Sequence, residues 1–184
     1  MTAADEQHLI QRAKQGSQEA FRCLVERHMK QAYSIAYGFV SDHDDADEVT
    51  QEAFVRAFRS LGSFREDSGF STWLYRIVVN LSLNQMRQNR KKKEREMRPD
   101  RALMMSATAV VPGEQGILSG HLERALNELS ALQRSVVILR HIDGRSTKEV
   151  SQILHCSEGT VKTHLFRGLK KLRDKLRFLE EEVD

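Results

Sequence analysis

Apolar residues recur at a spacing of three and four residues along almost the whole of this 184-residue chain. This spacing places them on one face of an α-helix, whereas a half-buried strand would need strict alternation, which no stretch sustains. The pattern predicts an all-α fold. The longest apolar runs, such as residues 136–139, are far shorter than the roughly 20 residues that a membrane-spanning helix needs, and no signal segment opens the chain. We therefore expect a cytoplasmic protein.

Both prolines of the chain, Pro99 and Pro112, lie in one stretch, residues 99–120, which also holds three glycines and lacks a helical period. This composition predicts a flexible linker between two small helical domains, each of a size that can fold alone. The predicted boundaries are residues 1–96 for the N-terminal domain, 97–119 for the linker and 120–184 for the C-terminal domain.

Three helices are predicted in the N-terminal domain. Ser17 can cap the first. The second begins in an acidic block, whose carboxylates suit the positive end of a helix dipole, and it stops at Gly62. A loop at residues 64–70 follows, and a third helix starts near Thr72. The expected buried faces are Phe21, Leu24, Val25, His28, Ala32, Ile35 and Phe39 on the first helix, Val49, Ala53, Phe54, Ala57, Phe58 and Leu61 on the second, and Trp73, Leu74, Ile77, Val78 and Leu81 on the third.

The net charge of +3 conceals a segregation of charges along the sequence. Residues 42–52 form an acidic block without Lys or Arg, while residues 87–101 and 162–177 are strongly basic. Two separate basic stretches favour two contacts with a polyanion, and an acidic patch favours a protein partner because it would repel phosphate. Charge runs are also common on solvated helix faces, so the charges alone leave both interpretations open.

The two cysteines, Cys23 and Cys156, lie far apart and belong to no metal-binding spacing. The carboxylates of the acidic block have no facing histidine, and no nucleophile is paired with a base. We predict no disulfide framework, no metal, no cofactor and no catalytic residue.

The C-terminal domain contains a predicted helix-turn-helix. Ser146, followed three residues later by Glu149, is a capping box that opens a short helix, residues 155–157 form the turn, and Ser157 can cap a longer helix. In a helix-turn-helix the second helix enters the major groove of DNA. A helical hairpin with a solvated basic face is the alternative interpretation.

The second helix of this motif has two distinct faces. Val161 and Leu165 are expected to pack against Val150 and Leu154. Arg and Lys can donate to guanine, whereas Thr and Phe can contact the thymine methyl group. The outward positions are Lys162, Thr163, Phe166, Arg167 and Lys170.

Three segments resemble those of extracytoplasmic-function (ECF) sigma factors of the sigma-70 family. Residues 156–168, CSEGTVKTHLFRG, resemble the recognition helix of that family. Residues 47–54, DEVTQEAF, resemble its polymerase-binding segment, and residues 64–80, FREDSGFSTWLYRIVVN, resemble its promoter-melting segment. The three occur in the family's order. Many relatives carry Pro where this chain has Ser157, but Ser caps a helix at least as well, so the fold is unaffected.

The resemblance implies an alternative sigma factor that docks on the β′ clamp helices and the β flap of core RNA polymerase and is controlled by an anti-sigma factor. It implies that the N-terminal domain recognises the minus-ten element and holds its non-template strand as single-stranded DNA, while the helix-turn-helix reads the double-stranded minus-thirty-five element. An autonomous helix-turn-helix regulator, which would bind a two-fold-symmetric operator without polymerase, is the alternative.

The resemblance also assigns residues to each contact. Trp73, one of those assigned, is also expected to be core packing because it lies beside core positions. The assigned residues are Asp47, Glu48, Gln51 and Glu52 for core polymerase; Phe64, Ser68, Phe70, Trp73, Arg76, Asn80 and Arg87 for the minus-ten DNA; and Lys162, Thr163, Phe166, Arg167 and Lys170 for the minus-thirty-five DNA.

Overall fold

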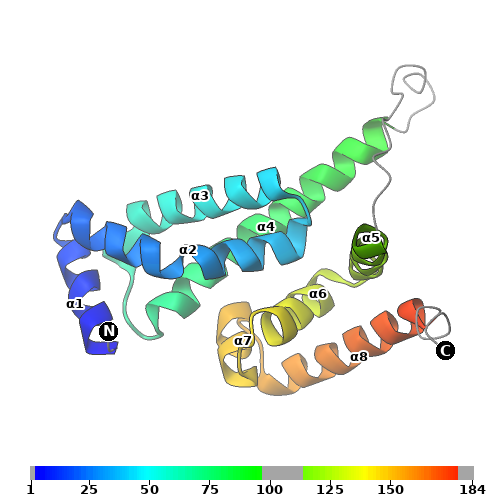
Figure 1. Cartoon of the computed structure of the whole chain (residues 1–184). Helices are drawn as coiled ribbons and strands as arrows, with labels where there is room; N and C mark the ends of the chain where they lie inside the picture. The colour runs from blue at the N-terminus through cyan, green and yellow to red at the C-terminus, as the bar shows by residue number, and fades with distance from the viewer. Residues whose placement is uncertain (1–2, 97–113, 178–184) are drawn as a thin grey trace.

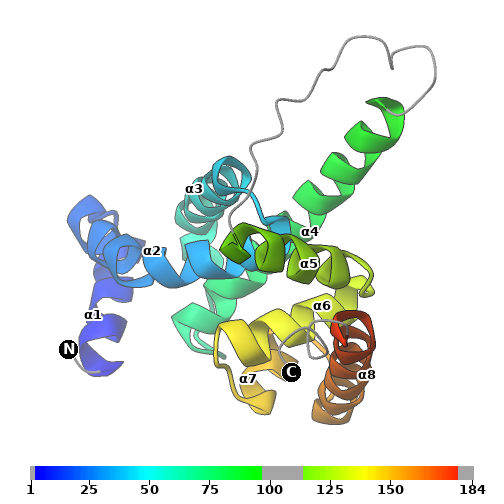
Figure 2. The same cartoon turned by 45° about the vertical axis from the view of Figure 1, so that its right-hand side comes forward.

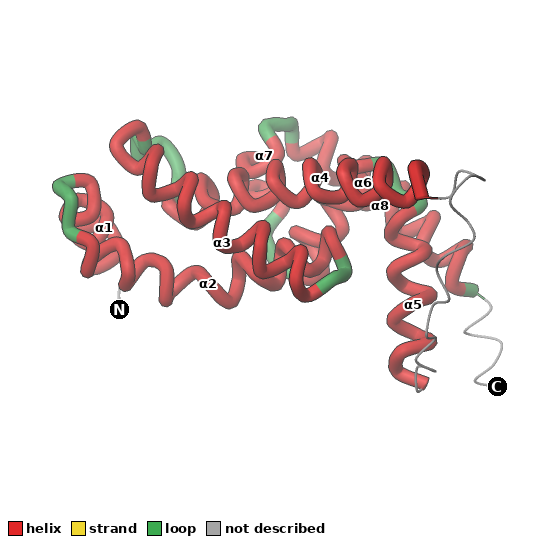
Figure 3. Tube along the Cα trace, turned by 90° about the horizontal axis from the view of Figure 1, so that it is seen from above, coloured by secondary structure: helices red, strands yellow, loops and turns green. Residues whose placement is uncertain are grey.

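The computed structural model describes residues 3–96 and 114–177, and every regular element in these two ranges is helical (Figure 3). The predicted all-α fold is confirmed. None of the helices described is long and apolar enough to cross a membrane. The helices form two groups in chain order, α1 to α4 and α5 to α8 (Figure 1).

The N-terminal group is built on α2 (Gln18–Val40), α3 (His43–Ser60) and α4 (Phe70–Glu96), which pack on one another. The hydroxyl of Ser17 accepts a hydrogen bond from the backbone N–H of Ala20, as the predicted cap requires. Asp42 caps α3 in the same way, through the N–H of Asp45. Fully buried side chains from all three helices form the core: Leu24, Ile35, Phe39, Ala53, Ala57, Leu74 and Val78.

Three features of this group differ from the prediction. A further helix, α1 (Ala3–Lys14), precedes Ser17 and buries Ile10. Phe58 is expected in the core but is 47% exposed, although its ring makes a T-shaped contact with Phe21, with ring centres 5.0 Å apart. α3 ends at Ser60 and a 3₁₀ turn, Leu61–Ser63, follows it, while α4 begins at Phe70 rather than near Thr72.

The C-terminal group consists of α5 (Glu114–Asn127), α6 (Ala131–Val137), α7 (Thr147–Leu154) and α8 (Glu158–Leu176), with a π-helical turn (Ile138–Ile142) after α6. α5 begins inside the stretch predicted as linker, so the expectation of irregular chain up to residue 120 is wrong. Residues 97–113, which hold both prolines, lie outside the described residues.

The two groups of helices contact each other, with α7 on α4 and the π-helical turn on α2 (Figures 1 and 2). At Gly38 of α2 the approach is so close that an added Cβ would lie 3.1 Å from Cγ2 of Ile138. The buried guanidinium of Arg134 donates hydrogen bonds to the backbone carbonyls of Gly38 and Phe39, near the end of α2. The guanidinium of Arg145 lies 4.7 Å from the centre of the Tyr75 ring. The C-terminal domain is thus docked on the N-terminal one.

Candidate nucleic-acid interface

The frame of the helix-turn-helix matches the prediction in detail. Ser146 and Glu149 form the capping box of α7, each side chain bonded to the backbone N–H of the other residue. His155 ends α7 in the left-handed conformation, with φ of 51°. Ser157 then caps α8 through the N–H of Thr160, at 3.1 Å. Local sequence therefore fixes the turn and the start of the second helix.

The inner face of α8 packs as predicted. Val161 and Val150 are completely buried, and Leu154 and Leu165 pack against them as partly buried side chains. Because this apolar contact fixes the rotation of α8 about its axis, the opposite face of the helix is turned to solvent.

The five predicted reading positions of α8 are on that outer side or at its edges, and all five are exposed: Lys162, Thr163, Phe166, Arg167 and Lys170. Phe166 is 72% exposed, so its ring is accessible to another molecule. The hydroxyl of Thr163 donates to the carbonyl of Gly159 at 2.9 Å, which leaves its lone pairs and methyl group available.

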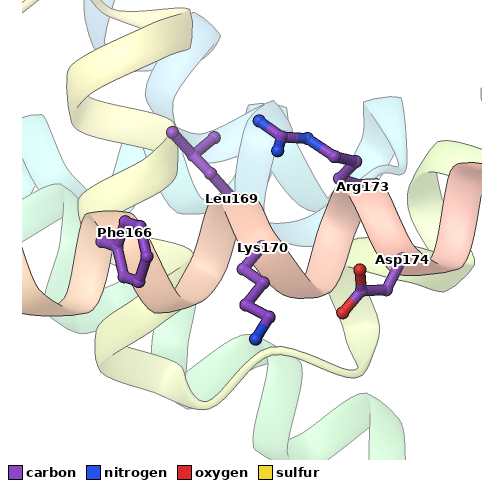
Figure 4. Close-up of a pocket in the computed structure, with 5 residues that line it drawn as sticks. All are labelled: Phe166, Leu169, Lys170, Arg173 and Asp174. Carbon is purple, nitrogen blue, oxygen red and sulfur yellow. The ribbon is translucent and has the colours of Figure 1, made fainter.

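A shallow groove of about 350 Å³ lies along this part of α8 (Figure 4). All five lining residues lie on one face of the helix, with Leu169 and Arg173 toward its upper edge in Figure 4 and Phe166, Lys170 and Asp174 toward its lower edge. The groove combines an apolar ring with cationic groups, which can contact a base methyl group and phosphates together.

The acidic block divides into inward and outward carboxylates. Asp45 is half buried and accepts hydrogen bonds from Gln85 at 2.7 Å and Asn89 at 2.6 Å, so it ties α3 to α4. The candidate polymerase contacts lie further along α3. Asp47, Glu48 and Gln51 are exposed, and Glu52 is half buried and paired with Arg56 at 2.7 Å. The exposed members can meet a basic partner without disturbing the core.

The aromatic residues predicted to capture the minus-ten strand form a cluster in the N-terminal domain. Phe64 is 4% exposed, Phe70 is 1% exposed, and Trp73 is half buried. The ring centres of Phe64 and Trp73 are 5.0 Å apart, and those of Phe70 and Trp73 are 5.6 Å apart. In this conformation the two phenylalanines are core residues, and only part of Trp73 is open to a base.

The polar members of the minus-ten set have different surroundings. Asn80 and Arg87 are exposed on α4, and Ser68 is half buried in the loop. Arg76 donates to the backbone carbonyl of Gln152 in α7 at 2.9 Å, and burial lowers its pKa. Of the predicted phosphate contacts, Arg76 is therefore occupied by the docked C-terminal domain.

Sequence reasoning missed the residues that support the loop before α4. The carboxylate of Glu66 accepts hydrogen bonds from Gln7, Gln11 and Lys14, all on α1. These three residues are spaced four and three apart, which places them on one face of a helix. This spacing is the sequence signal for the contact with Glu66. It predicts a polar helix face only if residues 3–14 are first predicted to be helical.

The remaining titratable residues suggest no other site. Within residues 3–96 and 114–177, no three His, Cys, Asp or Glu side chains are arranged to hold a metal ion. Cys23 and Cys156 are free thiols, both half buried.

Comparison with protein-family models gives two matches. The model of Sigma-70 region 2 matches residues 24–92, and that of Sigma-70, region 4 matches residues 120–172. The first range covers α3 and most of α2 and α4, and the second covers α7 and most of α8.

The chain is also similar to characterised proteins over nearly its whole length. It is 33% identical to the ECF RNA polymerase sigma factor SigW of Bacillus subtilis over 179 residues, which cover 92% of this chain and 96% of that protein. It is 34% identical to the ECF RNA polymerase sigma-E factor of Escherichia coli K12 over 180 residues, 93% of this chain and 94% of that protein.

Two solved structures have the same arrangement of helices. CnrH, solved with the cytosolic domain of CnrY, matches with a TM-score of 0.73 and 26% identity over 94% of this chain and 97% of that one. The sigma factor RpoE of Bartonella quintana, solved with the anti-sigma factor NepR, matches with a TM-score of 0.64 and 27% identity over 85% and 96%.

Proposed function

The chain belongs to the ECF sigma factors of the sigma-70 family, and from this we propose that it binds core RNA polymerase and directs promoter-specific initiation of transcription. The observation that carries the proposal is the joint presence of both sigma regions, with an exposed reading face on α8 and exposed carboxylates on α3. The autonomous regulator finds no support among these relatives, which are sigma factors. We expect a cytoplasmic protein without catalysis of its own.

Within this function we assign the acidic side of α3 to the polymerase and the two DNA-facing regions to the promoter. Asp47, Glu48 and Gln51 offer an exposed acidic surface to basic groups of the β′ clamp helices, with Glu52 at its edge. The C-terminal domain is assigned to the β flap and the minus-thirty-five element, and the loop before α4 to the minus-ten element. We also propose control by an anti-sigma factor, because a structural neighbour was solved with one.

The docked arrangement of the two domains has a consequence for promoter binding. The minus-ten and minus-thirty-five elements lie about 25 base pairs apart, which is about 85 Å of B-form DNA. α7 touches α4 in this structure, and α8, with 19 residues, is only about 28 Å long. We therefore infer that the two domains separate when both promoter elements are bound at once.

The experiment that tests the function is run-off transcription with purified core polymerase and promoters near the gene. We expect specific initiation only when the chain and core are combined, with little promoter binding by the chain alone. Core binding without initiation at any of these promoters would contradict the proposal, and a footprint on a symmetric operator without polymerase would favour the regulator.

The assignment of α3 can be tested separately by competition for core. Replacing Glu48 and Gln51 together with Ala should weaken the ability to compete with another sigma factor for core. Gln18→Ala with Glu19→Ala is a matched control, because it removes the same two residue types from exposed positions on α2. Equal competition by both double variants would refute the docking assignment.

A further inference from the structure

α1 and the loop before α4 are joined by one carboxylate. Oε1 of Glu66 accepts hydrogen bonds from Nε2 of Gln11 at 2.6 Å and Nζ of Lys14 at 2.7 Å, and Oε2 accepts one from Nε2 of Gln7 at 3.1 Å. These contacts link positions more than fifty residues apart in sequence. Three donors on one acceptor group fix both the position and the orientation of the Glu66 side chain.

The backbone at Glu66 is held in an unfavourable conformation. Its φ is +63°, in the left-handed region that non-glycine residues avoid. Such a conformation is strained and persists only where its surroundings hold it. The three hydrogen bonds from α1 supply that restraint, so the shape of the loop depends on α1.

The same lysine also contacts the aromatic cluster behind the loop. Nζ of Lys14 lies 5.4 Å from the centre of the Phe64 ring, and this ring packs on Trp73. α1 therefore supports the loop through both its carboxylate and its first aromatic residue.

The charges of the loop are balanced in a way that suits DNA. Its two carboxylates are each paired with a cation, Glu66 with Lys14 and Asp67 with Arg65 at 3.0 Å. The hydrogen bond from Lys14 is the largest cause that lowers the pKa of Glu66, which favours the ionised form of this carboxylate. Unpaired carboxylates here would repel the phosphates of a captured strand.

We propose that α1 is a positioning element for minus-ten recognition, in which Gln7, Gln11 and Lys14 hold Glu66 and thereby fix the loop that meets the non-template strand. The inference rests on the proposed function, since it assumes that the loop faces single-stranded promoter DNA. Glu66 is a positioning residue in this scheme, and it acts through the conformation of the loop.

The test uses the full chain with core polymerase in run-off assays. Each variant is compared on a cognate promoter and on promoters with single-base changes in the minus-ten or the minus-thirty-five element. Glu66→Ala should reduce discrimination among minus-ten bases about tenfold, which corresponds to the loss of one charge-assisted hydrogen bond or more, and should leave minus-thirty-five discrimination unchanged. Asp67→Ala is the matched control, because its ion pair is exposed and local to the loop.

A charge exchange distinguishes positioning from a general loss of structure. Lys14→Glu alone sets two carboxylates against each other and should lower minus-ten discrimination. Adding Glu66→Lys restores the pair, and the amides of Gln7 and Gln11 can rotate to accept from the new lysine, so discrimination should return to within about twofold of the original chain. Thermal unfolding checks that each variant is folded.

Two results would overturn the inference while leaving the function intact. One is a folded Glu66→Ala variant that keeps full minus-ten discrimination. The other is a loss of discrimination that is equal at both promoter elements and is not restored by the exchange. A wild-type chain that supports no initiation with core would overturn the proposed function together with the inference.

Discussion

The two regions of this sigma factor that we propose to face DNA present their predicted contacts in opposite ways. On α8, all five predicted reading side chains are exposed, and Phe166 is the most exposed large apolar side chain described. Before and within α4, Phe64 and Phe70 are buried, Trp73 is half buried, and Arg76 is bonded to α7. The predicted reading residues of α8 are thus all accessible to DNA, whereas several of the predicted minus-ten residues are buried or hydrogen-bonded within the protein.

The difference follows from the chemistry of the two tasks. A helix in the major groove reads base edges with side chains on its solvent face, so its core face and its reading face are separate. Unpaired bases are held by stacking on aromatic rings, and rings are also the side chains that a small domain most readily buries. We therefore infer that Ser68, Asn80, Arg87 and the open part of Trp73 meet the strand first.

The largest expected effect is a difference in stability between two Phe→Ala variants, one in each region. Phe70→Ala should lower the free energy of unfolding by about 3–5 kcal/mol, because it empties a fully buried site between Phe64, Trp73 and His28. Phe166→Ala should change it by less than about 0.5 kcal/mol, because the ring is exposed. Urea unfolding of both variants measures this, and similar losses would contradict the difference in burial between the two rings.

The second effect concerns reading by α8. Arg167→Ala in the holoenzyme should reduce discrimination between the cognate upstream element and its single-base variants by about 1–3 kcal/mol, since a bidentate contact to guanine would be lost. Lys171→Ala, another exposed cation on α8, is the control and should weaken all sequences alike. Competition for core should be unchanged in both. If Arg167→Ala behaves like the control, Arg167 contacts only phosphate.

What could be predicted from the sequence is mostly what depends on local interactions. The caps at Ser17, Ser146 and Ser157 and the buried stripe of α8 follow from residues within one or two turns of each other, and all are present. The exposed reading face of α8 was predictable for the same reason, because one helical period sets both of its faces.

What could not be predicted depends on contacts between distant segments. Phe58 continues the apolar stripe of α3, but its contact with the Phe21 ring of α2 leaves the ring 47% exposed. Nothing local to Arg76 indicates that it bonds to the carbonyl of Gln152, and nothing in the loop indicates that Glu66 is held by α1. The polar contacts around the predicted minus-ten residues are tertiary contacts between distant segments, so the helical periodicity of the sequence does not predict them.

A smaller effect would show whether docking of the two domains hides the N-terminal face. Gly38→Gln adds a good helix former to α2, which should stabilise that helix by about 0.5–1 kcal/mol. Its Cβ alone would lie 3.1 Å from Cγ2 of Ile138, so the whole side chain is expected to separate the domains. Gly120→Gln on α5 is the matched control, because an added Cβ there meets nothing within 4 Å. Small-angle scattering should give a larger radius of gyration for Gly38→Gln alone, and an unchanged radius would mean that the docking tolerates the side chain.

The smallest effect concerns acid and the buried aromatic cluster. His28 lies 5.3 Å from the Phe70 ring, and burial lowers its pKa although Glu6 nearby favours the charged form. The unfolded chain therefore takes up a proton on His28 at a higher pH than the folded chain does. The stability that neutral, buried His28 contributes is present above the ordinary histidine pKa near 6.5 and is lost as pH falls below it. His28→Gln lacks this dependence, so the stability advantage of the original chain over the variant should shrink on acidification. Melting temperatures at about pH 7.5 and pH 5.5 measure the change, with His8→Gln as the control because His8 is exposed on α1. An advantage that grows in acid would instead mean that His28 is charged and paired with Glu6, and that the cluster around Phe70 is less apolar than its burial indicates.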